Sequence, residues 1–332
     1  MKIAVIGSGS WGTAAAVLLA KHTDEVFLWS WKEEESKRID EFRENREYLP
    51  GVRLEENIIC THDMQKAVEN AGLIVTVVPS PATRTTAREL AKHIKSGQGV
   101  VNLSKGLEEG TLLRLSEVYR EEIPGVRLAV MSGPSHAEEV SKGLPTTNVV
   151  ASDDEDLAKL VQDVFMDEYF RVYTGNDMIG VELGGALKNV IALCAGICDG
   201  LGYGDNTKAA LMTRGIAEIT RLGVKMGAEA ETFAGLSGIG DLIVTCTSMH
   251  SRNRRAGILL GQGKSLSETL EEIHMVVEGV NAAKSALALS EKYGVTMPIV
   301  KEANEILYNN KNAREAVFAL MTRDKTNEGL KN

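Results

Sequence analysis

One lysine stands alone in an apolar stretch in the second half of the chain. Residues 183–198 read LGGALKNVIALCAGIC, and Lys188 carries the only charge among them. Burying an ammonium group without compensation is costly, so such a lysine either extends to the surface or faces a polar site. Desolvation at a polar site lowers the pKa of a lysine, which suits a general acid or base. We predict that Lys188 is catalytic and that Asn189 supports it; a structural lysine that extends to the surface is the alternative.

A cluster of basic residues follows about sixty residues later. Residues 251–255 read SRNRR, in a chain whose formal net charge is −9. Guanidinium groups bind phosphate through paired hydrogen bonds, and serine and asparagine add further donors. We predict a site for a small phosphorylated molecule, with a solvated basic face as the alternative.

A glycine-rich run, GLSGIGDLIVT at 235–245, precedes this cluster. It lacks the G-K-[ST] ending of a P-loop, so it is not predicted to be one. Asp241 opens a helix-like stretch at the end of the run. Its structural alternative is therefore the N-cap of that helix.

The N-terminus carries a second kind of signal. Residues 2–12 read KIAVIGSGSWG, a short apolar run followed by the pattern G-x-G-x-x-G at Gly7, Gly9 and Gly12. A helical stretch, 13–21, comes next. Strand, glycine turn and helix in this order are the context of a dinucleotide site, where the glycines permit a tight turn and a close approach of the pyrophosphate. A purely structural turn is the alternative.

The end of the second predicted strand, 25–29, bears on which dinucleotide binds. NAD-binding domains usually place an acidic residue there for the ribose hydroxyls. This chain has Ser30-Trp31-Lys32, in which Trp31 can stack on an adenine and Lys32 can pair with a 2′-phosphate. The pattern favours NADPH over NADH. One of the glutamates at 33–35 can still take the acidic role, unless all three form a solvated start of a helix.

The elements that must position these residues alternate through the first half of the chain. Further strands are predicted at 73–78, 99–103, 128–131, 148–151 and 169–173, with helices at 33–48 and 82–94. This alternation predicts a doubly wound parallel sheet. Lys105 and the loop at 132–137, which contains Gly133 and Ser135, follow strands and so lie where such sheets bind ligands.

The predicted secondary structure changes near Asn176, where strand patterns give way to long helical stretches. We predict a dinucleotide-binding domain over 1–175 and an all-helical domain over 176–332. Arg214, Glu218 and Arg221 on a helix at 209–223 are predicted to lie on a partly solvated face. Cys194 and Cys198 are predicted to be core thiols.

Composition limits the classes of function. Hydrophobic residues make up 43% and charged residues 25% of the 332 residues, as in ordinary globular proteins. The net charge argues against a nucleic-acid partner. The four cysteines do not form a disulfide framework or a zinc-type spacing, so no metal is expected. We expect no secretory signal, no membrane span and a cytoplasmic location.

Several longer motifs together resemble those of bacterial NAD(P)-dependent glycerol-3-phosphate dehydrogenases over nearly the whole length. They are GSGSWGTA at 7–14, SKGLE at 104–108, SGPSHAEE at 132–139, GGALKNVIA at 184–192, GDNTKAAL at 204–211, GIGDLIVTCTS at 238–248, SRNRR at 251–255 and VVEG at 276–279.

The resemblance implies roles for individual residues. Cofactor contacts would come from Ser10, Trp11, Trp31, Lys105, Ala137, Arg252, Val276 and Glu278. Substrate contacts would come from Lys105, Gly133, Ser135, Lys188, Asp241, Ser251, Arg252 and Asn253. Lys188 would be the general acid/base, and Asp241 and Thr245 would arrange the polar centre.

The implied activity is reversible reduction of dihydroxyacetone phosphate to sn-glycerol 3-phosphate, which supplies phospholipid synthesis. A homodimer is common for such folds. A 3-hydroxyacyl-CoA or 6-phosphogluconate type of dehydrogenase is the nearest alternative, but a His/Glu pair or a different lysine context would then be expected. A non-catalytic NADPH-binding sensor is an alternative from another class, and it would not need Lys188.

Overall fold

The chain divides into two compact units. The computed structural model describes residues 1–325, 327 and 328. Unit 1 comprises residues 1–105 and 113–178, and unit 2 comprises residues 106–112 and the chain from Ile179 onwards. The predicted single boundary near residue 175 does not account for the short segment 106–112, which belongs to unit 2 although it lies within the first half of the chain. The segment joins unit 2 because Leu107 is buried in that unit's hydrophobic core. The pattern of residue types along the sequence does not reveal this contact.

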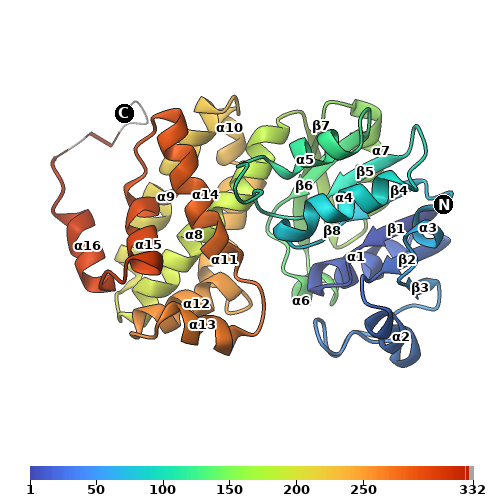
Figure 1. Cartoon of the computed structure of the whole chain (residues 1–332), viewed down its shortest axis with the longest axis horizontal. Coiled ribbons are helices and arrows are strands. Elements are labelled where there is room, and N and C mark those ends of the chain that lie inside the picture. Colours follow the sequence, from blue (N-terminus) through green and yellow to red (C-terminus); the bar gives the residue numbers. More distant parts are fainter. Residues whose placement is uncertain (326, 329–332) are drawn as a thin grey trace. The chain divides into compact units, whose positions relative to one another are not determined.

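Unit 1 contains one eight-stranded sheet in the order β3-β2-β1-β4-β5-β6-β7-β8 (Figure 1). Its strands are β1 (Lys2–Ile6), β2 (Glu25–Trp29), β3 (Ile58–Thr61), β4 (Leu73–Thr76), β5 (Gly99–Asn102), β6 (Arg127–Ser132), β7 (Thr146–Ser152) and β8 (Phe170–Gly175). The first six strands are parallel and follow the Rossmann order, which reverses direction between β1 and β4. Ligands bind at such a reversal, beside the carboxyl ends of the strands.

The prediction of a doubly wound sheet followed by helices is confirmed, but the prediction that the sheet is wholly parallel is wrong at β7. This strand pairs antiparallel with β6, and β8 is parallel to β7. The connection between β6 and β7 contains only the four-residue helix α6 (Ala137–Val140). So short a helix does not carry the chain back across the sheet, as a parallel crossover requires.

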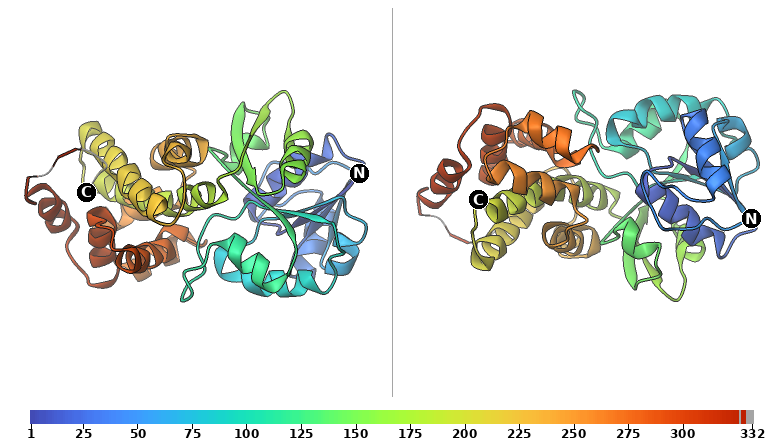
Figure 2. Two further views of the ribbon diagram at one scale, coloured as in Figure 1. Left: turned by 90° about the horizontal axis from the view of Figure 1, so that it is seen from above. Right: turned by 90° about the horizontal axis from the view of Figure 1, so that it is seen from below.

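Helices cover both faces of the sheet (Figure 2). Those of unit 1 are α1 (Ser10–Ala20), α2 (Glu33–Phe42), α3 (Met64–Val68), the 3-10 turn η1 (Ser80–Ala82), α4 (Thr83–Ala91), α5 (Leu115–Glu122), α6 and α7 (Glu155–Phe165). α1 packs against α6 and α7, whereas α4 packs against α5. The strands of the Rossmann part are buried on both sides, which explains why β1 is a continuous apolar run at Ile3–Ile6.

Unit 2 is helical. Its elements are α8 (Met178–Gly200), α9 (Asp205–Lys225), α10 (Ala230–Phe233), the π-turn η2 (Leu236–Gly240), α11 (Asp241–Thr247), α12 (Arg252–Gly261), α13 (Leu266–Ile273), α14 (Glu278–Tyr293), α15 (Pro298–Tyr308) and α16 (Ala313–Met321). α8 has the length and hydropathy to cross a membrane, although no such run was expected from the sequence. Its most apolar window is completely buried inside the protein, so α8 is a core helix.

Four glycines let α12 lie directly against α8. A Cβ atom on Gly196 or Gly200 would clash with the backbone of α12, and one on Gly257 or Gly261 would clash with the backbone of α8. Contact without intervening side chains brings the two helices unusually close. Since α12 begins in the SRNRR cluster, this contact fixes the cluster relative to Lys188 on α8.

The thiols on α8 are core residues, as predicted. Cys194 and Cys198 are buried, and neither is in a disulfide. Desolvation raises the pKa of both thiols, that of Cys198 to about 11. Because a thiolate is the reactive form, these side chains act as inert packing groups.

The prediction of a partly solvated face on α9 is wrong for Glu218, which is only 3% exposed. Its carboxylate accepts hydrogen bonds from the backbone N–H groups of Ile299 (3.0 Å) and Val300 (3.4 Å), at the start of α15. The unpaired N–H groups at a helix start explain why an acidic residue is buried there. Burial raises the pKa of Glu218 to about 7, although these two N–H groups oppose the shift.

This pKa gives a prediction for stability. A glutamate in the unfolded chain ionises near its ordinary pKa, so the protonated folded form is favoured at low pH and this stabilisation is lost as pH rises towards 7. Glu218→Gln should therefore raise the free energy of unfolding by about 3 kcal/mol at pH 8, with a smaller gain at pH 5. Urea unfolding at both pH values measures the difference. A gain that is equal at both pH values would contradict the assignment.

Candidate functional site

The turn between β1 and α1 has the backbone form that its glycines require. Gly7 has a φ of 121°, which disfavours any side chain, and a Cβ there would clash with the carbonyl of Val77 beyond β4. A Cβ on Gly12 would clash with the carbonyl of Gly7. Both glycines are therefore needed for the turn to close against the sheet.

Gly9 differs, because no atom lies within 4 Å of the place where its Cβ would be. It precedes α1, whose first turn has no side-chain cap and no acidic residue. Ser10 and the half-buried Trp11 begin this helix. Open space beside free N–H groups at a positive helix end suits a pyrophosphate. The turn thus fits the dinucleotide predicted from G-x-G-x-x-G.

The residues after β2 divide between solvent and interior. The Trp31 side chain is 73% exposed, with the Lys32 ammonium 5.1 Å from its ring centroid. Among the three glutamates, Glu35 is turned inwards and is only 6% exposed, and it accepts a hydrogen bond from the Ser30 hydroxyl at 2.9 Å. The solvated helix start therefore describes Glu33 and Glu34 but not Glu35.

A second group of predicted residues gathers after β5 and β6. The Lys105 ammonium donates to the carbonyl oxygen of Gly133 at 2.9 Å, and the Ser135 hydroxyl donates to the same oxygen at 3.0 Å. Gly133 has a φ of 151°, and a Cβ there would clash with Asn148 on β7. Ala137, the first residue of α6, is buried with Ala14 of α1. No sequence motif pointed to Asn148 as a residue of this group.

In unit 2, Lys188 is 5% exposed and does not extend to the surface. Its ammonium donates to Asp241 Oδ1 and to Thr245 Oγ1, both at 2.6 Å. The Thr245 hydroxyl in turn donates to the Asp241 main-chain oxygen at 2.6 Å. Asp241 is the first residue of α11, where Gly240 is the N-cap, so the N-cap alternative for Asp241 is wrong.

A close backbone contact brings Asp241 to Lys188. A Cβ on Gly184, one turn before Lys188 on α8, would lie 2.6 Å from the carbonyl oxygen of Ser237 in η2. Only a glycine allows the turn at 236–240 to lie this near to α8. The helix that follows the turn then starts beside the lysine.

The asparagines of the two predicted clusters bond to each other. Asn253 donates to Asn189 Oδ1 at 3.0 Å and accepts from the N–H of Gly279 at 2.8 Å. This chain of bonds links α8, α12 and the first turn of α14. It thereby places Glu278, the first residue of α14, near Arg252, the first residue of α12. Val276 lies two residues before Glu278 and is 41% exposed.

The three arginines of SRNRR do not share one role. Arg254 pairs with Asp199 at 2.8 Å and donates to the Thr247 carbonyl at 2.6 Å, so it is structural. Ser251 is the N-cap of α12, where its hydroxyl accepts from the N–H of Arg254. Asp199 also binds Lys208 at 2.5 Å. The sequence did not distinguish Arg254 from its neighbours.

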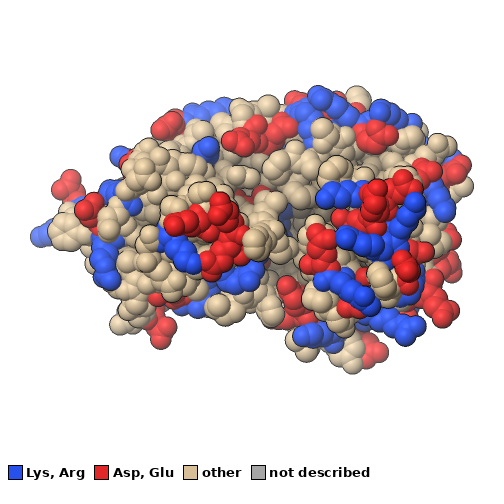
Figure 3. All heavy atoms as spheres, turned by 60° about the horizontal axis from the view of Figure 1, so that its bottom comes forward, with Lys and Arg blue, Asp and Glu red and all other residues tan. Residues whose placement is uncertain are grey.

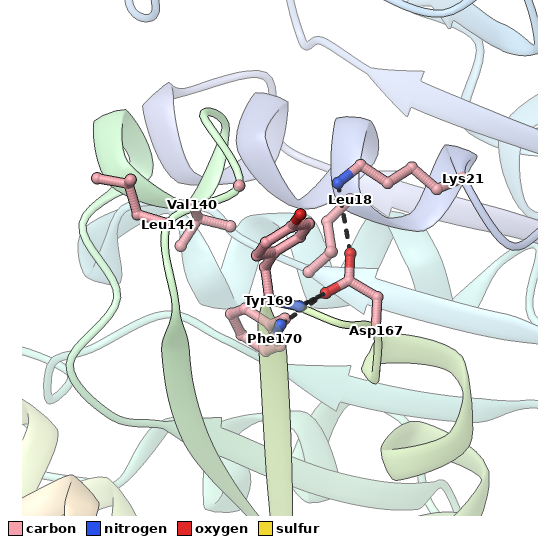
Figure 4. Close-up of a pocket in the computed structure, with 8 residues that line it drawn as sticks. Leu18, Lys21, Val140, Leu144, Asp167, Tyr169 and Phe170 are labelled. Atoms are coloured by element: carbon pink, nitrogen blue, oxygen red, sulfur yellow. Dashed lines mark hydrogen bonds and ion pairs between the residues drawn. The ribbon is translucent and has the colours of Figure 1, made fainter.

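A separate hollow of about 160 Å³ lies on unit 1 (Figure 4). It is lined by Leu18, Lys21, Val140, Gly143, Leu144, Asp167, Tyr169 and Phe170. The Asp167 carboxylate inside it already accepts from Lys21 and from two backbone N–H groups. The hollow is too shallow to enclose even a water molecule, whereas pockets that hold small-molecule ligands have about 300 Å³ or more. We do not assign it to the candidate site.

Two further features of the described residues are the surface charge and the possible metal-binding side chains. Acidic and basic side chains intermingle on the face of the molecule seen in Figure 3. Within residues 1–325, 327 and 328, no three His, Cys, Asp or Glu side chains are grouped so as to hold a metal ion.

A Rossmann unit with an open glycine turn, together with a helical unit that buries a lysine–aspartate pair, defines a two-domain dehydrogenase that uses a nicotinamide dinucleotide. Comparison with known proteins specifies the family. Residues 2–158 match the family described as NAD-dependent glycerol-3-phosphate dehydrogenase N-terminus, and residues 177–318 match its C-terminus. The chain belongs to the NAD-dependent glycerol-3-phosphate dehydrogenase family and is an oxidoreductase that uses NAD(H) or NADP(H).

Individual relatives are similar over almost their whole length. The chain is 55% identical to "Glycerol-3-phosphate dehydrogenase [NAD(P)+]" of Fusobacterium nucleatum, covering 98% of both chains. It is 59% identical to the protein of the same name from Moorella thermoacetica, covering 98% of this chain and 97% of that one. The crystal structure of glycerol-3-phosphate dehydrogenase from Coxiella burnetii superposes with a TM-score of 0.94 at 38% identity, covering 97% of this chain and 99% of that one.

The different surroundings of the glycines give a prediction. Gly9 has a φ of −67°, which alanine adopts readily, whereas Gly12 has no room for a Cβ. Gly9→Ala should leave the melting temperature within about 2 °C of wild type. Because the methyl group occupies the space above the turn, it should raise the Kd for NADH by about tenfold or more.

Gly12→Ala serves as the contrast, since it should lower the melting temperature by several degrees even without ligand. Differential scanning calorimetry and NADH fluorescence titration measure the two quantities. Unchanged NADH affinity in folded Gly9→Ala would remove this turn from the dinucleotide site.

Proposed function

We propose that this enzyme reduces dihydroxyacetone phosphate to sn-glycerol 3-phosphate, reversibly, with Lys188 as the general acid/base. The observation that carries the proposal is the buried cluster of Lys188, Asp241 and Thr245, in a chain of the glycerol-3-phosphate dehydrogenase family. The relatives from Fusobacterium and Moorella carry the name of this activity.

Reduction of a ketone needs a hydride and a proton. A bound reduced nicotinamide supplies the hydride. The Lys188 ammonium stabilises the negative charge that develops on the substrate oxygen and donates a proton to it. The Asp241 carboxylate pairs with the ammonium before transfer, and Thr245 fixes the direction in which the ammonium points. In the reverse direction, the neutral amine accepts the proton.

The remaining predicted residues hold the two ligands. The turn of Gly7, Gly9 and Gly12 receives the dinucleotide phosphates, and contacts with the rest of the cofactor come from Ser10, Trp11, Trp31, Lys105, Ala137, Arg252, Val276 and Glu278. Lys105, Gly133 and Ser135 hold the substrate beside the cofactor. Arg252 binds its phosphate through the guanidinium group, next to Ser251 and Asn253, which also order the start of α12.

The product supplies phospholipid synthesis, and the enzyme works in the cytoplasm. Lys32 beside the exposed Trp31 favours NADPH, through a contact with the 2′-phosphate.

The activity is tested by the loss of nicotinamide absorbance with dihydroxyacetone phosphate, in parallel with NADPH and NADH. Turnover should occur with both, and kcat/KM should be higher with NADPH. Lys32→Ala should reduce this preference for NADPH, because it removes the positive charge after β2 and leaves the glycine turn at 7–12 unchanged. No turnover with either dinucleotide, despite tight binding, would favour a non-catalytic sensor.

The role of Lys188 has a test of its own. Lys188→Met should lower kcat by several orders of magnitude and leave the Kd for NADH near that of wild type, since proton transfer is lost and the glycine turn is untouched. Steady-state kinetics and NADH titration measure the two effects.

Lys208→Met is the matched control. Lys208 also pairs with a partly enclosed aspartate of unit 2, Asp199, but it is not bonded to Asp241 or Thr245. The variant Lys208→Met should keep kcat within about tenfold of wild type. Near-normal turnover in Lys188→Met would rule out the proposed acid/base.

A further inference from the structure

The glycine turn that receives the dinucleotide is bonded on its buried side to a network that includes Ser30, Glu35 and Asn45, which lie outside the sequence motifs. Ser8, between Gly7 and Gly9, is 6% exposed and donates its hydroxyl proton to Glu35 Oε1. The same oxygen accepts from the hydroxyl of Ser30. One carboxylate oxygen on α2 therefore ties the glycine turn to the end of β2.

The main chain of Ser8 is held as well. Its carbonyl oxygen accepts from Asn45 Nδ2 at 2.6 Å and from the Thr13 hydroxyl at 3.3 Å. The Asn45 amide group also donates to Thr13 Oγ1 at 2.8 Å, and its oxygen accepts from the N–H of Tyr48 at 3.2 Å. Asn45 and Thr13 are 1% and 0% exposed, so these bonds are shielded from water.

A glycine-rich turn without such ties has many backbone states, and fixing one residue costs about 1–2 kcal/mol at 25 °C. Holding the turn before the ligand arrives removes part of this cost from binding. Neither Glu35 nor Asn45 is placed to bind a ligand directly, because both are buried and both already accept or donate within the protein.

We propose that Glu35 and Asn45 are positioning residues, which hold the turn at 7–12 in the form that receives the phosphates of the dinucleotide. The inference rests on the proposed function, since it concerns the cofactor site of that reaction. It assigns to one of the glutamates at 33–35 an indirect role, in place of a direct contact with the ribose.

Two substitutions of Glu35 separate hydrogen bonding from charge. Glu35→Ala removes both bonds to Oε1 and should raise the Kd for NADH about tenfold, which corresponds to about 1.4 kcal/mol. Glu35→Gln keeps an oxygen that accepts from both hydroxyls and should stay within about threefold of wild type. Glu41→Gln, an exposed residue of the same helix, is the control and should change nothing.

Asn45→Ala tests the other tie and should also raise the Kd for NADH about tenfold. Asn57→Ala is its matched control, because the Asn57 amide nitrogen also makes two hydrogen bonds within unit 1, in its case to the carbonyls of Ala20 and Thr23, away from the turn. A general loss of stability would appear in both variants as a lower melting temperature. A positioning role raises the Kd only in Asn45→Ala.

NADH fluorescence titration of the full chain gives the Kd, and the KM for dihydroxyacetone phosphate at saturating NADH should stay unchanged in every variant. If Glu35→Ala does not fold, Ser8→Ala replaces it, because it removes one tie from the turn itself. The inference would be overturned if the Kd for NADH stayed at the wild-type value both in Glu35→Ala, or its substitute, and in Asn45→Ala. The proposed function would still stand in that case, provided that the wild-type protein turns over. Wild-type protein that neither binds NADH nor turns over would overturn the proposed function and this inference with it.

Discussion

The burial of the Lys188 ammonium group is the constraint on which unit 2 depends. An isolated buried charge costs several kcal/mol, and breaking a buried pair costs about 3–5 kcal/mol. Asp241, 53 residues further along the chain, supplies the opposite charge, and Thr245 supplies a further acceptor. The pair therefore stabilises only the arrangement that brings the start of α11 to the middle of α8.

Close backbone contacts make this arrangement possible. Gly184 lets η2 lie against α8 just before Asp241, and the glycines at 196, 200, 257 and 261 let α12 lie along the rest of the helix. Asn253 then bonds to Asn189, next to the lysine. A larger side chain at these glycines would separate the helices and leave the buried charges without partners. Packing and polar chemistry in unit 2 thus depend on the same few small residues.

Unit 1 follows a similar logic around its glycine turn. Two glycines are needed because neighbouring backbone leaves no room for a Cβ, and the third leaves open space for a ligand. Buried hydroxyl, amide and carboxylate groups form hydrogen bonds to the side of the turn that faces the protein interior. In both units, buried side chains bond to the backbone that must come close to a ligand or to another helix.

The sequence by itself determined the Rossmann class, the helical second region and the family. Apolar periodicity, the spacing of Gly7, Gly9 and Gly12, and a lone lysine in an apolar helix are local signals, and each has a local physical cause. The tertiary structure alone decided which partners these residues meet. It paired Lys188 with Asp241, made Arg254 structural, buried Glu35 and Glu218, and reversed β7. Those outcomes depend on contacts between residues far apart in the chain, where burial and charge compensation act and where a one-dimensional pattern carries no signal.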